Sequence, residues 1–500
     1  MRSLWLDRPL PSHPPVEGGR SFDVVVVGAG ITGLTTALLL ARGGARVAVL
    51  EARHVGAGTT GNTTAKVSLL QGTKLSRISR RHTAGTVGSY VTANVEGQQW
   101  LLRWCADHDV PVERRPAVTY ATTPEGRDDV VAEFEAARAA GLPVEFLDDP
   151  GLPFPTTGAV RLADQAQLDP LDVLLALAED VAAHGGVVFE GSRVTGVSGH
   201  GPYRLQVEHA EVTADRVVLA TGVPILDRGG FFARLKPLRS YAIAFDVPEP
   251  DALPTVMALS ADRPRRSLRT SSTGGTTRLL VGGAGHVTGR AESESASLAE
   301  LEEWTVHHFP GARVTHAWSA QDYRCSDDLP AIGALHPGAD GILAATGYDK
   351  WGMATGVAAA LTLSATVLGG EEPEWAYPLR SFRPGRASGA DRLLRNNATV
   401  AARLVSDWAK PRVHSSGVVP PEGMGRVELD GGRPVAVSTV GGTTTRVSAV
   451  CSHLGGIVTW NDAEQSWDCP LHGSRFCADG TVLEGPATEP LPGVDEDQVD

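Results

Sequence analysis

Cysteine is scarce in this chain of 500 residues, and the five that occur are Cys105, Cys325, Cys451, Cys469 and Cys477. An odd number without a framework spacing argues against a disulfide-stapled secreted domain, so we expect a reducing, cytoplasmic compartment. Positive charge is also in deficit, with 45 Lys and Arg against 58 Asp and Glu. The net charge of −13 makes nucleic acid an unexpected partner.

Long hydrophobic runs are absent as well. The longest apolar stretches are Val24–Val27, Ala37–Ala41 and Val357–Leu363, which are too short or too interrupted to span a bilayer, so no membrane span is expected. Residues 1–20 contain no apolar core of a secretory signal and are expected to form an irregular lead-in. The length predicts two or three domains.

Three glycines near the N-terminus have the spacing of a dinucleotide-binding loop. Gly28, Gly30 and Gly33 follow a buried-strand run, Phe22–Val27, and open a helical stretch. The first glycine permits the tight turn, the second lets the backbone approach a pyrophosphate, and the third allows close helix–strand packing. Glu51 ends the next predicted strand, where a carboxylate binds ribose hydroxyls. A merely structural turn would not require that acid, so the unit predicts a bound dinucleotide.

Two cysteines and two histidines near the C-terminus form a second motif. Cys451 and His453 make a C-x-H pair, and Cys469 and His472 make a C-x-x-H pair. This is the ligand pattern of a Rieske [2Fe–2S] centre, in which two cysteines hold one iron and two histidines hold the other. The alternative is a zinc site, but zinc fingers group their ligands as a Cys pair and a His pair.

Four further segments resemble the flavin-contacting parts of oxidases of the D-amino-acid-oxidase/glycine-oxidase type. They follow the order of that class: Gly56–Lys66, Val217–Gly222, Ser319–Gly333 and Gly341–Met353. With the cluster motif, they make the chain similar to a bacterial family of FAD-dependent oxidoreductases that carry a C-terminal Rieske domain. No second G-x-G-x-x-G follows a strand, so a nicotinamide is not expected to supply electrons.

The resemblance implies an α/β FAD-binding Rossmann-like domain with an inserted antiparallel-sheet substrate domain, followed by an all-β Rieske domain. The oxidoreductase domain is expected at residues 21–385, a connecting helix or linker at 386–412 and the Rieske domain at 413–500. Within the first domain, the FAD-binding parts are expected at about 21–80, 155–235 and 320–385, and the substrate parts at about 81–154 and 236–319. The acidic, proline-bearing segment 371–386 is interpreted as a tether.

Site residues follow from the same resemblance. The expected FAD-binding residues are Gly28, Gly30, Gly33, Glu51, Ala52, Thr60, Gly61, Asn62, Thr63, Val194, Thr221, Gly222, Gly347, Gly352 and Met353. The expected substrate-pocket residues, which are the candidates for catalysis, are Arg239, Tyr241, Arg269, His286, Lys350 and Trp351. For the arginines and the histidine, a surface or core role is the alternative interpretation.

The predicted function is that of an FAD-dependent oxidoreductase with one Rieske [2Fe–2S] cluster. It would oxidise a small amine, amino acid or related metabolite by hydride transfer to the flavin, and the cluster would pass single electrons to or from an external acceptor or donor protein. The alternative is a flavin/iron–sulfur electron-transfer or redox-sensing protein without an organic substrate of its own. A Rieske oxygenase is excluded because such enzymes place the Rieske module first and need a mononuclear iron held by two His and a carboxylate.

Overall fold

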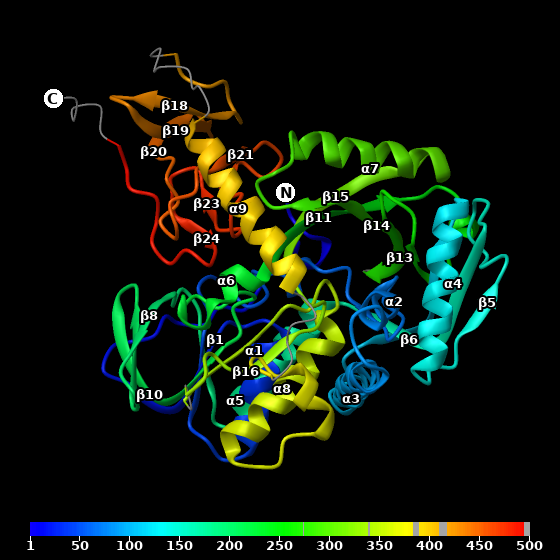
Figure 1. The fold of residues 1–500 in the computed structure, drawn as a ribbon, viewed down its shortest axis with the longest axis horizontal. Coiled ribbons are helices and arrows are strands. Elements are labelled where there is room, and N and C mark those ends of the chain that lie inside the picture. The colour runs from blue at the N-terminus through cyan, green and yellow to red at the C-terminus, as the bar shows by residue number, and fades with distance from the viewer. Residues whose placement is uncertain (274, 339–340, 384–389, 410–417, 495–500) are drawn as a thin grey trace.

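The computed structural model describes residues 1–273, 275–338, 341–383, 390–409 and 418–494. It confirms the predicted fold class, with two large sheets flanked by helices and a small all-β module near the C-terminus (Figure 1). The predicted start of that module at residue 413, and both ends of the predicted linker 386–412, lie outside the described residues.

The first sheet carries the dinucleotide-binding unit. Its strands run in the order β16-β17-β10-β1-β2-β7, with β8 and β9 beside β10. Their bounds are β1 (Ser21–Val27), β2 (Val47–Leu50), β7 (Val187–Phe189), β8 (Val194–Ser198), β9 (Tyr203–Val207), β10 (Ala210–Leu219), β16 (Ala331–Ala334) and β17 (Ile342–Thr346). The central strands are parallel and rich in valine because helices cover one face and further chain covers the other.

Nine α-helices lie within the described part of the chain. They are α1 (Ile31–Arg42), α2 (Lys74–Ser79), α3 (Ala84–Asp107), α4 (Pro124–Ala139), α5 (Pro170–Ala183), α6 (Phe231–Arg234), α7 (Glu294–His308), α8 (Gly352–Leu368) and α9 (Ala390–Ala409). Helices α1, α5 and α8 pack beneath the first sheet (Figure 1). None of the described helices is long and apolar enough to cross a membrane.

The second sheet is mostly antiparallel and runs in the order β15-β11-β14-β13-β12-β4-β6-β3, with β5 beside β6. Its strands are β3 (Lys66–Val67), β4 (Val112–Ala121), β5 (Glu145–Leu147), β6 (Gly158–Leu168), β11 (Leu235–Asp246), β12 (Met257–Ser260), β13 (Arg266–Thr273), β14 (Thr276–Val287) and β15 (Arg313–Cys325). Three of these strands, β3, β6 and the end of β15, fall within the ranges expected for the FAD-binding parts. In the structure β3 pairs with β6, β6 with β4, and β15 with β11.

Two segments expected to be irregular are packed against the first domain. In the lead-in, Trp5 is 1% exposed and its indole N–H donates to the Thr63 carbonyl at 2.7 Å, while Ser3 Oγ donates to the Gly61 carbonyl at 2.7 Å. In the predicted tether, residues 374–379 form a 3-10 helix that buries Trp375 in the core beneath the first sheet. In each segment the burial of one tryptophan stabilises ordered structure, although the prolines and glycines nearby favour an irregular chain.

The C-terminal module consists of two small antiparallel sheets. The first contains β18 (Gly425–Asp430), β19 (Arg433–Val440) and β20 (Thr443–Ser448), and the second contains β21 (Thr459–Asn461), β22 (Ser466–Asp468), β23 (Arg475–Cys477) and β24 (Val482–Glu484). Trp467 and Phe476 are fully buried at its centre. Helix α9 lies between the module and the first domain, and its Val400 and Leu404 pack on the module's core (Figure 1).

Candidate functional site

The dinucleotide loop connects β1 to the start of α1. Gly28 has φ of +107°, and a Cβ there would lie 2.7 Å from the Ala220 carbonyl oxygen on the neighbouring strand. Only glycine fits both the left-handed conformation and the close approach. Glu51 lies at the end of β2, where its carboxylate accepts the backbone N–H of Ala29 at 2.9 Å and that of Arg53 at 3.0 Å. The acid therefore fixes the loop from the adjacent strand.

A cavity of about 900 Å³ extends from this loop to the second sheet. Twelve of the fifteen expected FAD-binding residues line it: Gly28, Gly30, Glu51, Ala52, Thr60, Asn62, Thr63, Val194, Thr221, Gly222, Gly352 and Met353. The other three, Gly33, Gly61 and Gly347, are packing positions, because a Cβ on any of them would come within 2.4 Å of a neighbouring atom. The size, the backbone-lined phosphate end and the acid at the strand end fit FAD.

The start of α8 forms another part of the cavity wall. Trp351, Gly352 and Met353 line the cavity, and the helix N-terminus has no side-chain cap. The preceding residues Asp349 and Lys350 have positive φ values of 53° and 75°, which turn the chain sharply into the helix. Uncapped N–H groups and the positive end of the helix dipole suit a partly negative group in the cavity.

A buried cluster of charges lies beneath this turn. The Asp349 carboxylate contacts Lys74 Nζ at 3.1 Å, Arg324 Nε at 2.8 Å and the Arg77 guanidinium. Burial opposes its ionisation, but the three cations outweigh burial and hold the pKa of Asp349 well below its usual range. Asp349 is therefore ionised, and its charge is fully compensated by its neighbours.

Two cations in the cavity wall have no such partner. Arg265 donates to Thr73 Oγ1 at 2.7 Å and makes no ion pair with a carboxylate of the described chain. The Lys350 side chain is exposed to the cavity yet enclosed by protein, and desolvation lowers its pKa to about 8.

A third cation, Lys66, also lines the cavity. Lys66, which is 9% exposed, donates to the Ala258 carbonyl at 3.1 Å, and burial lowers its pKa to about 7. Sequence reasoning missed Arg265 and gave Lys66 no role of its own.

Four of the six expected substrate-pocket residues line the cavity, namely Tyr241, His286, Lys350 and Trp351. The Tyr241 and His286 rings lie 5.7 Å apart. The Tyr241 hydroxyl is buried without a hydrogen-bond partner in the described chain, whereas His286 Nε2 faces the Glu294 carboxylate at 3.9 Å. Burial lowers the pKa of His286, so its ring is neutral at pH 7. Unsatisfied polar atoms in a cavity wall mark places where a ligand forms hydrogen bonds.

The other two expected residues, Arg239 and Arg269, do not line the cavity. Arg269 is 2% exposed, and its Nη1 donates to the carbonyls of Thr64, Ala65 and Leu168. It therefore holds three backbone segments together. Arg239 faces the C-terminal module, where its contacts are described below.

The four candidate cluster ligands come together on two adjacent loops. The thiols of Cys451 and Cys469 lie within hydrogen-bonding distance of each other. This hydrogen bond lowers the pKa of Cys451 to about 7. The rings of His453 and His472 lie 5.1 Å apart. His472 Nδ1 is buried without a partner in the described chain, as a nitrogen reserved for a metal would be.

This arrangement fits a two-iron cluster. Among the described residues, no three His, Cys, Asp or Glu side chains gather tightly enough to hold a single ion. A mononuclear zinc site needs four ligands around one ion, whereas each iron of a Rieske centre takes only two from the protein. The thiol pair and the imidazole pair therefore fit the cluster and disfavour zinc.

Comparison with known proteins agrees with both sites. A model described as "FAD dependent oxidoreductase" matches residues 23–366, and one described as "Rieske [2Fe-2S] domain" matches residues 410–495. The chain belongs to the FAD dependent oxidoreductase family. Its first domain binds FAD and its Rieske domain binds a [2Fe–2S] cluster. YhfW of Bacillus subtilis (strain 168), named as a Rieske 2Fe-2S iron-sulfur protein, is 32% identical over 496 residues, which cover 98% of this chain and 96% of that protein.

Other relatives match one part of the chain. The cytochrome b6-f complex iron-sulfur subunit of Chlorobaculum tepidum is 40% identical over 72 residues, or 14% of this chain and 39% of that protein. Glycine oxidase from Geobacillus kaustophilus has a TM-score of 0.62 at 20% identity, covering 73% of this chain and 99% of that one. L-amino acid deaminase from Proteus vulgaris has a TM-score of 0.60 at 15% identity, covering 75% and 100%. At these identities the two structures show the fold of the oxidoreductase domain.

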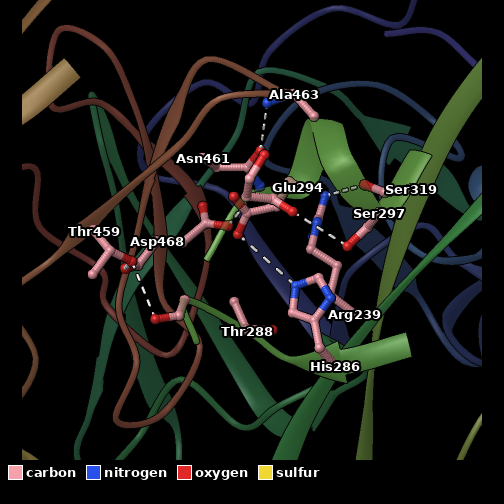
Figure 2. A network of polar contacts seen from close by, with 12 residues as sticks. Arg239, His286, Thr288, Glu294, Ser297, Ser319, Thr459, Asn461, Ala463 and Asp468 are labelled. Carbon is pink, nitrogen blue, oxygen red and sulfur yellow. Dashed lines mark hydrogen bonds and ion pairs between the residues drawn. The ribbon is translucent and has the colours of Figure 1, made fainter. Parts of the chain in front are cut away.

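Buried charges join the Rieske domain to the second sheet of the oxidoreductase domain. Arg239 Nε donates to Glu464 Oε2 at 2.5 Å, and Arg475 contacts Glu464 and Asp468, both at 2.9 Å. Figure 2 shows Arg239 and His286 extending from this sheet toward Glu294, Asn461 and Asp468. The Arg239–Glu464 contact therefore ties the two domains together, while Arg475 holds Glu464 in place from within the Rieske domain.

Proposed function

We propose that the chain oxidises a small amine, amino acid or related metabolite at the FAD, and that the Rieske cluster carries single electrons to or from an acceptor. The observation that carries the proposal is the continuous cavity, which joins the dinucleotide loop to a wall containing the unpaired cations Arg265 and Lys350. Unpaired cations in the cavity wall suit an anionic substrate, which a protein that only relays electrons does not need to bind.

The bound cofactors supply the chemistry of two-electron oxidation at the flavin and one-electron transfer at the cluster. The protein's side chains supply binding and proton handling. Arg265 is suited to hold a substrate carboxylate, since a guanidinium forms paired hydrogen bonds with such a group. Tyr241 is suited to orient the substrate through its unsatisfied hydroxyl. Lys66, with its pKa of about 7, is suited to hold or release a proton near neutral pH.

The compartment belongs to the same proposal. The odd number of cysteines, two of which are expected cluster ligands, supports a reducing compartment such as the cytoplasm.

The first experiment adds a pool of amino acids and amines to the holoprotein without oxygen and records the flavin absorbance and the cluster EPR signal. Flavin bleaching followed by a reduced-cluster signal is the expected result. If neither centre changes while dithionite reduces both, that pool contains no substrate and the electron-transfer alternative gains weight.

Once a substrate is found, Arg265→Met tests the carboxylate contact. Loss of a hydrogen-bonded charge pair costs about 1.5–3 kcal/mol, so kcat/KM for a carboxylate substrate falls about 10- to 100-fold. The matched control is Arg278→Met, which removes an arginine whose ion pair with Asp246 lies at the surface. Equal activity of the two variants would exclude a role for Arg265 in binding.

A further inference from the structure

The imidazole edge of the cluster site is covered by the oxidoreductase domain of the same chain. The Phe232 ring at the start of α6 lies 5.7 Å from the His453 ring and 5.3 Å from the His472 ring. Asp227 Oδ1 lies 2.7 Å from His453 Nε2. The His453 side chain is 5% exposed, and His472 is 7% exposed. An external protein cannot reach these rings without displacing this segment, so the histidine side of the cluster faces only its own chain.

The second cluster loop approaches the cavity at one point. Gly473, which directly follows the ligand His472, offers its carbonyl oxygen to Gln321 Nε2 at 2.8 Å. Gln321 lies on β15, is 2% exposed, and lines the cavity that fits FAD. One side chain therefore contacts both the loop that carries a cluster ligand and the cofactor cavity.

Both ends of the Gln321 amide are fixed. Thr288 Oγ1 donates to Gln321 Oε1 at 2.7 Å, so the amide orientation is set, and Nε2 also lies 2.7 Å from the Tyr323 hydroxyl. Tyr323 lines the same cavity, and its hydroxyl donates to the Gly485 carbonyl at 3.3 Å. That contact is longer and reaches the second cluster loop only indirectly, through Ala487, whose N–H donates to Ser474 Oγ at 3.0 Å. The contact from Gln321 to Gly473 is the more direct connection.

Glycines on both sides make this close approach possible. A Cβ on Gly473 would lie 2.5 Å from the Pro237 side chain, and a Cβ on Gly289 would lie 3.1 Å from the Cys469 carbonyl carbon. Both glycines have positive φ values, which further disfavours a side chain at either place. The backbone of the cluster loop therefore packs closely against the oxidoreductase domain, on the side chains of Pro237 and Gln321 and on the backbone at Gly289.

From these contacts we infer that FAD and the cluster exchange electrons within one chain, across the Gln321–Gly473 contact. The inference rests on the proposed function, in which both cofactors work in one redox cycle. In the step, one electron leaves reduced FAD and enters the oxidised cluster, where one ferric ion becomes ferrous. The second electron stays on the flavin, no proton crosses the contact, and no bond of the protein forms or breaks. Gln321 is a positioning residue because it holds the cluster loop against the cavity wall.

The test is flash photoreduction of the anaerobic holoprotein, with a deazaflavin dye delivering less than one electron per molecule. Flavin and cluster absorbance are then followed in time. The native protein should show a first-order exchange phase whose rate does not depend on protein concentration. In Gln321→Met, this rate should fall several-fold, because a thioether cannot donate a hydrogen bond to the Gly473 carbonyl and the contact between the two cofactor sites is lost.

Two further variants make the result specific. Gln321→Asn keeps an amide on a shorter side chain that cannot span the contact, and it should also slow the exchange. The control is Gln167→Met on β6, which removes a buried glutamine bonded to Glu113 and to the Thr270 carbonyl. FAD content, the cluster EPR signal and both midpoint potentials are measured in all three variants, so that slower exchange is distinguished from a damaged cofactor site.

An unchanged exchange rate in both Gln321 variants would overturn the role of this contact. An exchange rate that rises with native protein concentration would overturn transfer within one chain. The assay contains no organic substrate, so either result leaves substrate oxidation standing. Conversely, a failure to find a substrate leaves the exchange phase measurable.

Discussion

Removal of Arg239 should loosen the Rieske domain from the oxidoreductase domain. The Arg239 side chain is 2% exposed and its partner Glu464 is 16% exposed, so the ion pair between the two domains is largely shielded from water. Breaking a buried pair by removing one partner costs about 3–5 kcal/mol, because the remaining charge loses its compensation. Here Arg475 stays 2.9 Å from Glu464. We therefore expect Arg239→Met to cost about 3 kcal/mol, at the lower end of that range.

The assay is urea unfolding of the holoprotein, followed by the visible circular dichroism of the cluster. With a denaturant slope of about 3 kcal/mol per molar, the loss corresponds to a midpoint lower by about 1 M urea. Arg278→Met is the control, since its ion pair with Asp246 at 3.0 Å is at the surface, where such pairs contribute about 0–1 kcal/mol. If the two variants unfold at the same urea concentration, the buried pair does not hold the domains together.

Three further predictions concern the cofactor sites and acid stability. Cys451→Ala should abolish the cluster EPR signal while the flavin absorbance remains, whereas Cys477→Ala should retain both; loss of the cluster in both variants would contradict the ligand assignment. Gly33→Ala should purify with little FAD, because the new Cβ would lie 1.9 Å from a backbone oxygen. The control is Gly88→Ala, at an open position on α3, which should bind FAD normally when the flavin absorbance is measured. Burial opposes ionisation of Glu464, but the neighbouring arginines lower its pKa from 4.5 to about 2. The ionised Glu464 therefore stabilises the folded protein fully above pH 4.5, and this stabilisation is lost as the pH falls toward 2. Unfolding midpoints measured across this range should fall in the native protein and change less in Glu464→Gln.

Local sequence patterns were sufficient to predict the cofactor sites. The strand, glycine turn, helix and acid of the dinucleotide unit are contiguous in the chain, and the structure has them as β1, α1 and β2. The four cluster ligands likewise lie on two loops close in sequence. Their chemistry requires given residue types at fixed short spacings, and such spacings can be recognised without knowledge of distant contacts.

Side-chain direction within the second sheet could not be predicted in the same way. Simple alternation along β11 places Arg239 and Tyr241 on one face. The pairing of β11 with β14 is irregular between these two residues, and such a bulge re-aims side chains. Tyr241 consequently lines the cavity while Arg239 contacts Glu464 of the Rieske domain. The bulge depends on the partner strand, so nothing in the β11 sequence itself reveals it.

The sequence alone therefore determined which cofactors the chain binds, and it predicted the residues that form their loops. Tertiary structure decided what surrounds those loops: the cations Lys66 and Arg265 in the cavity wall, and Phe232 against the cluster histidines. Gln321 and Gly473 are 152 residues apart in sequence, yet they are hydrogen-bonded. Cofactor loops follow from short-range covalent spacing, whereas the contact between the two cofactor sites depends on how separately folded surfaces pack, which no local pattern records.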